Sequence, residues 1–184
     1  MKTPLSFQIT EYDCGPTSLL NALRFLYNRQ EIPVEIIKEI YKDTLDQDYN
    51  GTSRDAIKKL SEKINEIKGD KILNIHSSYL AKKDVNIHMI KNCLDNKGVA
   101  LYRTFQSGEH YSIITKIGKR HAYIFDPYYV SASYFKGDKE VKKYFNHPFT
   151  YNRRVTLKRF NSEKKENFAL GPIEGREVLL LNRT

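Results

Sequence analysis

Residues 8–20 read Gln-Ile-Thr-Glu-Tyr-Asp-Cys-Gly-Pro-Thr-Ser-Leu-Leu, and they place a cysteine just before a predicted helix. Apolar side chains recur at helical spacing over residues 16–27. Pro16 marks the start of this helix, because proline is tolerated in the first helical turn, where its missing N–H would have no partner. A thiol at a helix N-terminus faces the positive end of the dipole and unpaired N–H groups, which both favour the thiolate. Cys14 is therefore the candidate nucleophile.

Three neighbours of Cys14 have expected roles. Gly15 lacks a side chain, so we expect it to let a substrate approach the backbone closely. Gln8 lies six residues upstream, and we expect its side-chain amide to point at an oxyanion formed beside the sulfur. Asp13 is interpreted as a helix cap or a solvated charge.

A nucleophilic cysteine needs a base, and among five histidines His110 is the one that is well placed. It precedes a run of β-branched and apolar residues, 111–117, that reads as a strand. The next predicted strand, 121–125, follows a tight Gly-Lys-Arg turn and ends at Asp126. In an antiparallel hairpin the start of the first strand lies beside the end of the second, which puts His110 next to Asp126. With Cys14 they form a predicted nucleophile, base and orienting acid.

This pattern resembles the bacteriocin-processing peptidases, papain-like cysteine proteases that remove double-glycine leader peptides. The resemblance rests on Gln8, on Asp13-Cys14-Gly15, and on His110 sixteen residues before Asp126-Pro127, and it covers about residues 3–129. It implies a papain-like fold with Cys14 as nucleophile and His110 as general base. It also implies that Gln8 supplies the oxyanion hole and that Asp126 orients the histidine.

The fate of the acyl-enzyme stays open between two reactions. Residues 14–18, Cys-Gly-Pro-Thr-Ser, depart from the Cys-Gly-x-Ala-Cys commonest in leader peptidases. They are similar to stand-alone relatives, which include transpeptidase-like and amide-forming enzymes. Attack by water makes a peptidase, whereas attack by an amine in a dry pocket makes an acyltransferase. A third alternative is an inactive peptide-binding module, and the presence of all four candidate residues argues against it.

The expected fold class is α+β and papain-like, in one domain spanning residues 1–184. A mainly helical half, residues 1–97, is expected to pack on an antiparallel sheet half, residues 98–184. From about residue 131 the chain reads as a divergent basic extension whose strands would extend the sheet or cover its edge. The remaining predicted elements are helices at 34–41, 52–67, 84–94 and 138–145, and strands at 71–75, 98–105, 153–160 and 177–181.

The charge of the chain suggests acidic partners. Net charge is +9, from 31 Lys and Arg against 22 Asp and Glu, and residues 131–184 hold 12 of these cations against 6 of the acids. Such a surface attracts an acidic peptide or an acyl thioester on an acidic carrier protein. A lysine-rich solvated surface is the plainer interpretation. We do not expect nucleic-acid binding, because no nucleic-acid motif accompanies the charge.

Composition and the remaining candidate residues lead to expectations about the location of the protein, its cofactors, and the roles of Cys93 and the tyrosines. Hydrophobic residues make up 40% of the chain, and no apolar run approaches the ~20 residues of a membrane span, so we expect a cytoplasmic protein without a membrane partner. No cofactor or metal is expected, because His76 and His88 lack clustered ligands. Cys93 reads as a core residue of a helix. The tyrosine-rich residues 128–135 are interpreted as edge packing, with the lining of a substrate pocket as the alternative.

Overall fold

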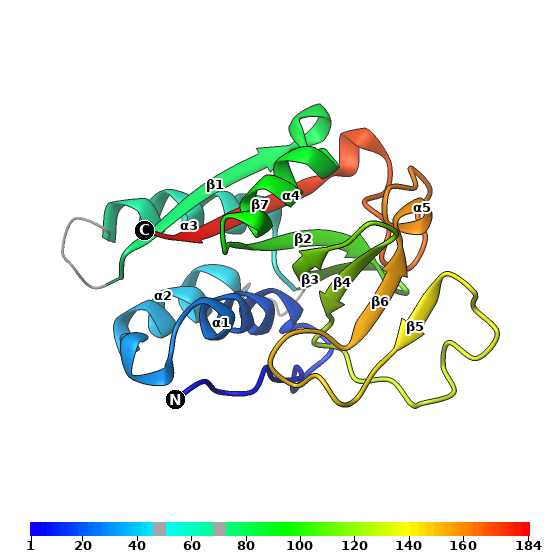
Figure 1. Cartoon of the computed structure of the whole chain (residues 1–184). Helices are drawn as coiled ribbons and strands as arrows, with labels where there is room; N and C mark the ends of the chain where they lie inside the picture. The colour runs from blue at the N-terminus through cyan, green and yellow to red at the C-terminus, as the bar shows by residue number, and fades with distance from the viewer. Residues whose placement is uncertain (46–50, 68–72) are drawn as a thin grey trace.

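Three helices come first and a seven-stranded sheet follows in the computed structural model, which describes residues 1–45, 51–67 and 73–184 (Figure 1). This is the α+β class that the sequence predicts. The helices are α1 (Cys14–Leu26), α2 (Val34–Thr44), α3 (Arg54–Ile67), α4 (Ile87–Asp95) and α5 (Leu157–Phe160), with 3₁₀ turns η1 (Arg29–Glu31), η3 (Lys82–Asp84) and η4 (Ile173–Gly175). The strands are β1 (Ile75–Ala81), β2 (Val99–Phe105), β3 (Glu109–Ile117), β4 (His121–Phe125), β5 (Val141–Lys143), β6 (Arg153–Thr156) and β7 (Glu177–Arg183).

The sheet is antiparallel throughout, with the strand order β1-β7-β2-β3-β4-β6-β5. The strand predicted at 153–160 forms β6, which extends the sheet at one edge together with β5. The expectation that the last strand also adds to an edge is wrong, because β7 lies between β1 and β2. The physical reason is that β7 is apolar on both faces: Val178 and Leu180 belong to one core cluster, Leu179 and Leu181 to the other. A strand with two apolar faces is most stable inside a sheet that is covered on both sides.

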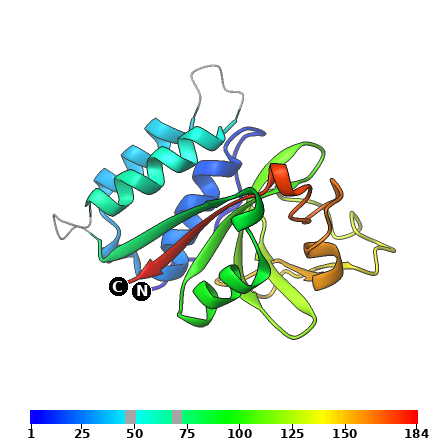
Figure 2. The ribbon, with the colours of Figure 1, turned by 90° about the horizontal axis from the view of Figure 1, so that it is seen from above.

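Both faces of the sheet are covered. Figure 2 shows α1, α2 and α3 on one side and α4 on the other. Strand residues alternate between the two core clusters, so that Leu101 and Ile113 pack with the first three helices. Tyr102 and Ile114 face the opposite cluster. The site described below lies where α1 meets the β3–β4 end of the sheet.

Several predicted boundaries in the second half need correction. The strand expected at 71–75 begins only at Ile75, and residues 71–72 lie outside the described residues. The helix expected at 138–145 is wrong, because β5 stands there; Asp138 Oδ1 accepts the backbone N–H groups of residues 140 and 141 and so begins a turn instead. The strand expected at 153–160 stops at Thr156, whose side chain accepts the N–H of Arg159 and caps α5.

No helix within the described ranges is long and apolar enough to cross a membrane.

Candidate active site

His110 and Asp126 lie side by side, as the hairpin register predicts. In the β3–β4 pair Ile113 is opposite Phe125, which brings the start of β3 to the residue after β4. His110 Nε2 lies 2.7 Å from Asp126 Oδ1, and both side chains are buried. β3 begins at Glu109, so His110 is held by the strand itself rather than by the preceding turn. This placement is what a base and its orienting acid require.

Cys14 is the first residue of α1 and lines a pocket of about 450 Å³ together with His110 and Gln8. A hydrogen bond from Ser18 Oγ to the carbonyl of Tyr111, 2.9 Å long, anchors α1 beside the histidine. Because Asp126 occupies Nε2 of the imidazole, Nδ1 is the nitrogen left to face Cys14.

The electrostatics of the pocket favour a charged imidazole. Burial lowers the pKa of His110, but the carboxylate of Asp126 raises it more, by its charge and its hydrogen bond. Cys14 adds a hydrogen bond and a coulombic attraction, and together these raise the pKa of His110 to about 10. A histidine in this setting holds its proton at neutral pH, and a cation beside a thiol stabilises the thiolate.

The same shift makes a prediction for the stability of the fold. The folded pKa of His110 lies above the ordinary 6.5. Its stabilisation is therefore fully present below pH 6.5 and is lost as pH rises toward 10, by up to ~1.4 kcal/mol per pH unit. Urea unfolding of the wild type and of His110→Gln at pH 6 and pH 9 should show a smaller difference in unfolding free energy at pH 9. An equal or larger difference at pH 9 would mean that the proton on His110 does not stabilise the fold.

Gln8 is held against the residue that follows the acid. Its backbone N–H donates to the carbonyl of Pro127 at 2.9 Å, and its side-chain Nε2 donates to the carbonyl of Thr10 at 2.7 Å. The second N–H of the amide is left over, and Oε1 is buried with no hydrogen-bond partner among the described residues. Because Gln8 lines the same pocket as Cys14, this N–H is in the region where an oxyanion donor is needed.

Asp13 organises the loop before Cys14, a role that the sequence did not reveal. It is buried, and its carboxylate accepts hydrogen bonds from the backbone N–H groups of Ile9 and Thr10 and from the hydroxyls of Thr10 and Thr17. Burial raises the pKa of Asp13, but these four bonds outweigh it and keep the pKa below its usual value. Since Thr10 in turn accepts from the Gln8 amide, Asp13 fixes both ends of the loop. It is not a solvated charge, and although it occupies the N-cap position of α1, as predicted, its side chain makes no capping bond to the helix backbone.

The missing side chain at Gly15 makes room for Thr52, not for a substrate. A Cβ on Gly15 would lie 2.0 Å from Thr52 Oγ1. That hydroxyl donates to the carbonyl of Thr44 at 2.8 Å and so ties α2 to the residues before α3. The expected use of Gly15 is therefore corrected to a packing requirement.

Gly15→Ala should lower the free energy of unfolding by ~1–3 kcal/mol, because the added methyl displaces Thr52 and breaks its bond to Thr44. Chemical unfolding measures this change. Gly108→Ala is the matched control, since nothing lies within 4 Å of the position that its methyl would take, and it should stay within ~0.5 kcal/mol of the wild type. Equal stability of the two variants would contradict the packing at Gly15.

The tyrosine-rich segment serves two purposes. Tyr128 and Tyr134 line the pocket with Cys14, which is the alternative the sequence left open. The ring of Tyr128 is edge-on to His110 at 6.3 Å between centroids, and its hydroxyl donates to Glu11 at 3.3 Å. Tyr129 instead packs edge-on against Phe7, which is the packing interpretation.

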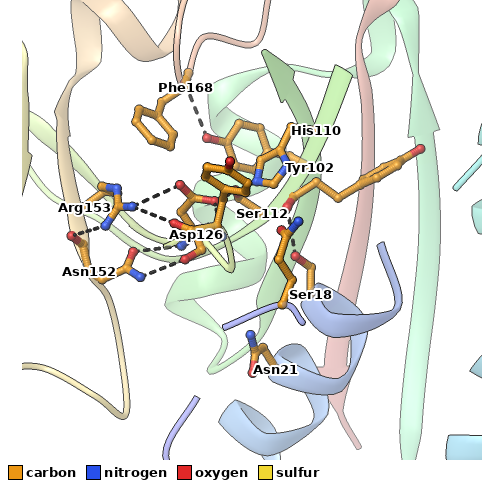
Figure 3. A network of polar contacts seen from close by, with 12 residues as sticks. Ser18, Asn21, Tyr102, His110, Ser112, Asp126, Asn152, Arg153 and Phe168 are labelled. Carbon is orange, nitrogen blue, oxygen red and sulfur yellow. Dashed lines mark hydrogen bonds and ion pairs between the residues drawn. The ribbon is translucent and has the colours of Figure 1, made fainter. Parts of the chain in front are cut away.

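Two residues that support Asp126 could not be recognised in the sequence (Figure 3). Asn152 holds the backbone of Asp126, since its Oδ1 accepts the N–H and its Nδ2 donates to the carbonyl, both at 2.8 Å. Arg153 is fully buried, and its Nη2 lies 3.2 Å from Asp126 Oδ2. Ser112 and the N–H of Tyr128 also donate to Oδ1 of the acid. The sequence carries no local signal for these contacts, because Arg153 is the first residue of a strand in which polar and apolar residues alternate as in many other strands.

Cys93 lies in the core, as predicted. Its sulfur contacts the carbonyls of Val99 and Leu181 and the Oδ1 of Asn182. Burial raises the pKa of its thiol to about 11, with these contacts opposing only part of the effect. Cys14 and Cys93 are both buried free cysteines, and of the two it is Cys14 that lines the pocket with His110. Across the described part of the chain, no group of three or more His, Cys, Asp or Glu is arranged to hold a metal ion.

The structure places the thiol at the start of α1 in one pocket with a histidine, and the histidine is hydrogen-bonded to the aspartate that follows β4, which is the arrangement that a cysteine peptidase requires. Residues 1–157 match the model of the Peptidase C39-like family, and the chain belongs to that family. The resemblance to bacteriocin-processing peptidases is thereby confirmed, and the match reaches through β5 and β6, beyond the residues that carried it in the sequence.

Among solved structures, the peptidase domain of Streptococcus mutans ComA is similar over 97% of this chain and 98% of that domain, with a TM-score of 0.42 and 13% identity. Comparison with the curated proteins finds no match.

Proposed function

We propose that this chain is an acyl-transfer enzyme that works through a thioester on Cys14, and that peptide hydrolysis is its reaction. The observation that carries the proposal is the position of His110, between the thiol at the start of α1 and the buried carboxylate of Asp126. Membership of a peptidase family supports hydrolysis over other fates of the thioester. A free thiol at Cys14 also favours work in a reducing compartment such as the cytoplasm.

The first half of the reaction forms the thioester. The Cys14 thiolate attacks the carbonyl carbon of a peptide bond, and the negative charge moves to the carbonyl oxygen. The Gln8 amide and the backbone N–H of Cys14, at the helix start where N–H groups lack intrahelical partners, donate to that oxygen. The C–N bond then breaks, and His110 gives its proton to the departing amine.

The second half releases the acyl group. His110, now neutral, takes a proton from water, and the resulting hydroxide attacks the thioester carbon. The C–S bond breaks, the carboxylic acid leaves, and the thiolate beside a protonated His110 is restored. Asp126 keeps the imidazole in one orientation and stabilises its charged form throughout.

The proposal is tested by incubating the purified chain with fluorogenic peptides that carry Gly-Gly on the acyl side of the cleaved bond, the substrate class suggested by the resemblance. Peptides with Val-Val at the same two positions are the matched control. We expect hydrolysis of the first set, abolished in Cys14→Ala. No hydrolysis of any peptide, together with no acyl transfer to added amines, would overturn the proposal and leave a binding module.

An acyltransferase is the second candidate, and a basic cleft beside the pocket favours it. The cleft holds about 570 Å³, and its cationic lining comprises Lys136, Lys139, Lys142, Lys143 and Arg154. Its two acids, Asp138 and Glu140, are already paired with Arg159. The segment that separates it from the catalytic pocket contributes Phe135 to the cleft and Tyr134 to the pocket.

An acidic carrier protein docked at this basic cleft would bring an acyl thioester close to Cys14. The two candidates are separated by product analysis. We expect an acyl thioester and a primary amine to give free acid if the chain is a peptidase. Amide formation that falls as salt rises, and that is lost in Lys142→Glu, would establish the acyltransferase instead.

A further inference from the structure

Arg153 is a fully buried cation directly behind the candidate acid (Figure 3). Its Nη2 donates to Asp126 Oδ2 at 3.2 Å and to the carbonyl of Tyr128 at 3.0 Å, and its Nη1 donates to the carbonyl of Asn152 at 3.1 Å. The rings of Phe135 and Phe168 lie 5.7 and 5.9 Å from its guanidinium carbon. Burying two opposite charges is costly, and an apolar pair of similar volume is often at least as stable. A structural role alone therefore does not account for the ion pair.

The charged and titratable groups around Asp126 come from several elements. His110 faces it from β3, and Arg153 faces it from β6. Lys143 on β5 and Tyr102 on β2 also interact with its charge. Burial raises the pKa of Asp126, but His110, Arg153 and the N–H of Tyr128 outweigh it and hold the pKa below its usual value. Arg153 is the fixed cation at hydrogen-bond distance, because a histidine that works as acid and base loses its charge once in each cycle.

We propose that Arg153 is a positioning residue that keeps Asp126 ionised and directed at His110 in both protonation states of the histidine. The inference rests on the proposed acyl transfer through Cys14. When His110 has given its proton to the leaving amine, a buried carboxylate without Arg153 would be left unpaired. Arg153 supplies the compensating charge at that step. It also neutralises part of the attraction of Asp126 for the imidazolium proton, and so helps His110 to act as a general acid.

A titration of His110 separates this role from a merely structural one. The imidazole is followed by NMR in the full chain with Cys14→Ser, which removes coupling to the thiol, and the signal is assigned with His110→Gln. In Arg153→Met the midpoint should move upward by ~1 pH unit, because Asp126 is no longer shared with a second cation. Arg153→Lys should return it to within ~0.3 units of the parent, since the charge is kept. If Arg153→Met does not fold, Arg153→Gln replaces it and keeps donors without charge.

Arg176 is the matched control. It is also buried, but among the described residues its guanidinium donates to the carbonyls of Gly171 and Asn161 and to no carboxylate, and Arg176→Met should leave the midpoint unchanged. The proposal would be overturned if Arg153→Met or Arg153→Gln folds and the midpoint of His110 equals that of the parent.

With Cys14 present, Arg153→Gln should lower kcat ~10- to 100-fold at constant KM, and Arg153→Lys should recover most of the lost kcat. Because the titration needs no substrate, it remains decisive even if peptide hydrolysis fails.

Discussion

Replacing His110 with alanine is expected to slow the alkylation of Cys14 by iodoacetamide at pH 6 by ~100-fold or more. In the wild type the imidazole beside the thiol is charged at this pH, because its pKa is raised to about 10. An adjacent cation favours the thiolate, which is the form that reacts. Without His110 the thiol loses the neighbouring cation, and only the N-terminus of α1 is left to favour the reactive thiolate.

The measurement is the mass of the intact protein against time in a Cys93→Ser background. Cys93 is buried and its thiol pKa is raised to about 11, so Cys93→Ser removes a second thiol from the mass spectrum without removing a reactive one. His88→Ala is the control, because His88 is exposed on α4 and should not affect the rate. Equal alkylation rates with and without His110 would remove the thiolate–imidazolium pair from the mechanism.

Asp126→Asn is expected to lower kcat for peptide hydrolysis by ~10³- to 10⁴-fold. The neutral amide no longer stabilises the imidazolium by its charge, so the pKa of His110 falls from its wild-type value of about 10. The pH profile of kcat should then lose its plateau at neutral pH. The variant also leaves Arg153 as a buried cation without its carboxylate, which destabilises the fold by ~3–5 kcal/mol, so rates are normalised to the folded fraction measured by circular dichroism.

Asp138→Asn is the control for this prediction, because Asp138 pairs with Arg159 at the basic cleft and is not in the catalytic pocket. It should leave kcat within a factor of ~2. If folded Asp126→Asn hydrolysed peptides at the wild-type rate, the carboxylate would have no part in orienting or charging His110.

The part of the site that could be predicted depends on short sequence patterns: strand periodicity, a turn and helical spacing. The position of His110 beside Asp126 follows from strand periodicity and a three-residue turn, and both are read within about twenty residues of sequence. The start of α1 at Cys14 follows from Pro16 and the apolar spacing after it. These signals are short in range, and the structure agrees with them to within two residues.

Long-range pairing explains what could not be predicted. β7 has the composition of a strand, but its place between β1 and β2 depends on partners that lie between 76 and 108 residues away in the chain. Arg153 likewise contacts Asp126 across 27 residues and the turn after β4. Asp13 was visible as an acid beside the cysteine, but its four hydrogen bonds form only when the loop from Ile9 to Thr17 is folded. No residue type by itself distinguishes such a carboxylate from a solvated one.

The most direct measurement of the central claim is to capture the thioester. The chain is mixed with an activated acyl ester, quenched in acid within seconds, digested, and mapped by mass spectrometry. We predict one acyl group per chain on the peptide that contains Cys14, released by neutral hydroxylamine as a thioester is, and no acyl group on Cys93. His110→Ala should abolish its accumulation. Acylation found only on lysines, or equally on both cysteines, would contradict the assignment of Cys14 as the nucleophile.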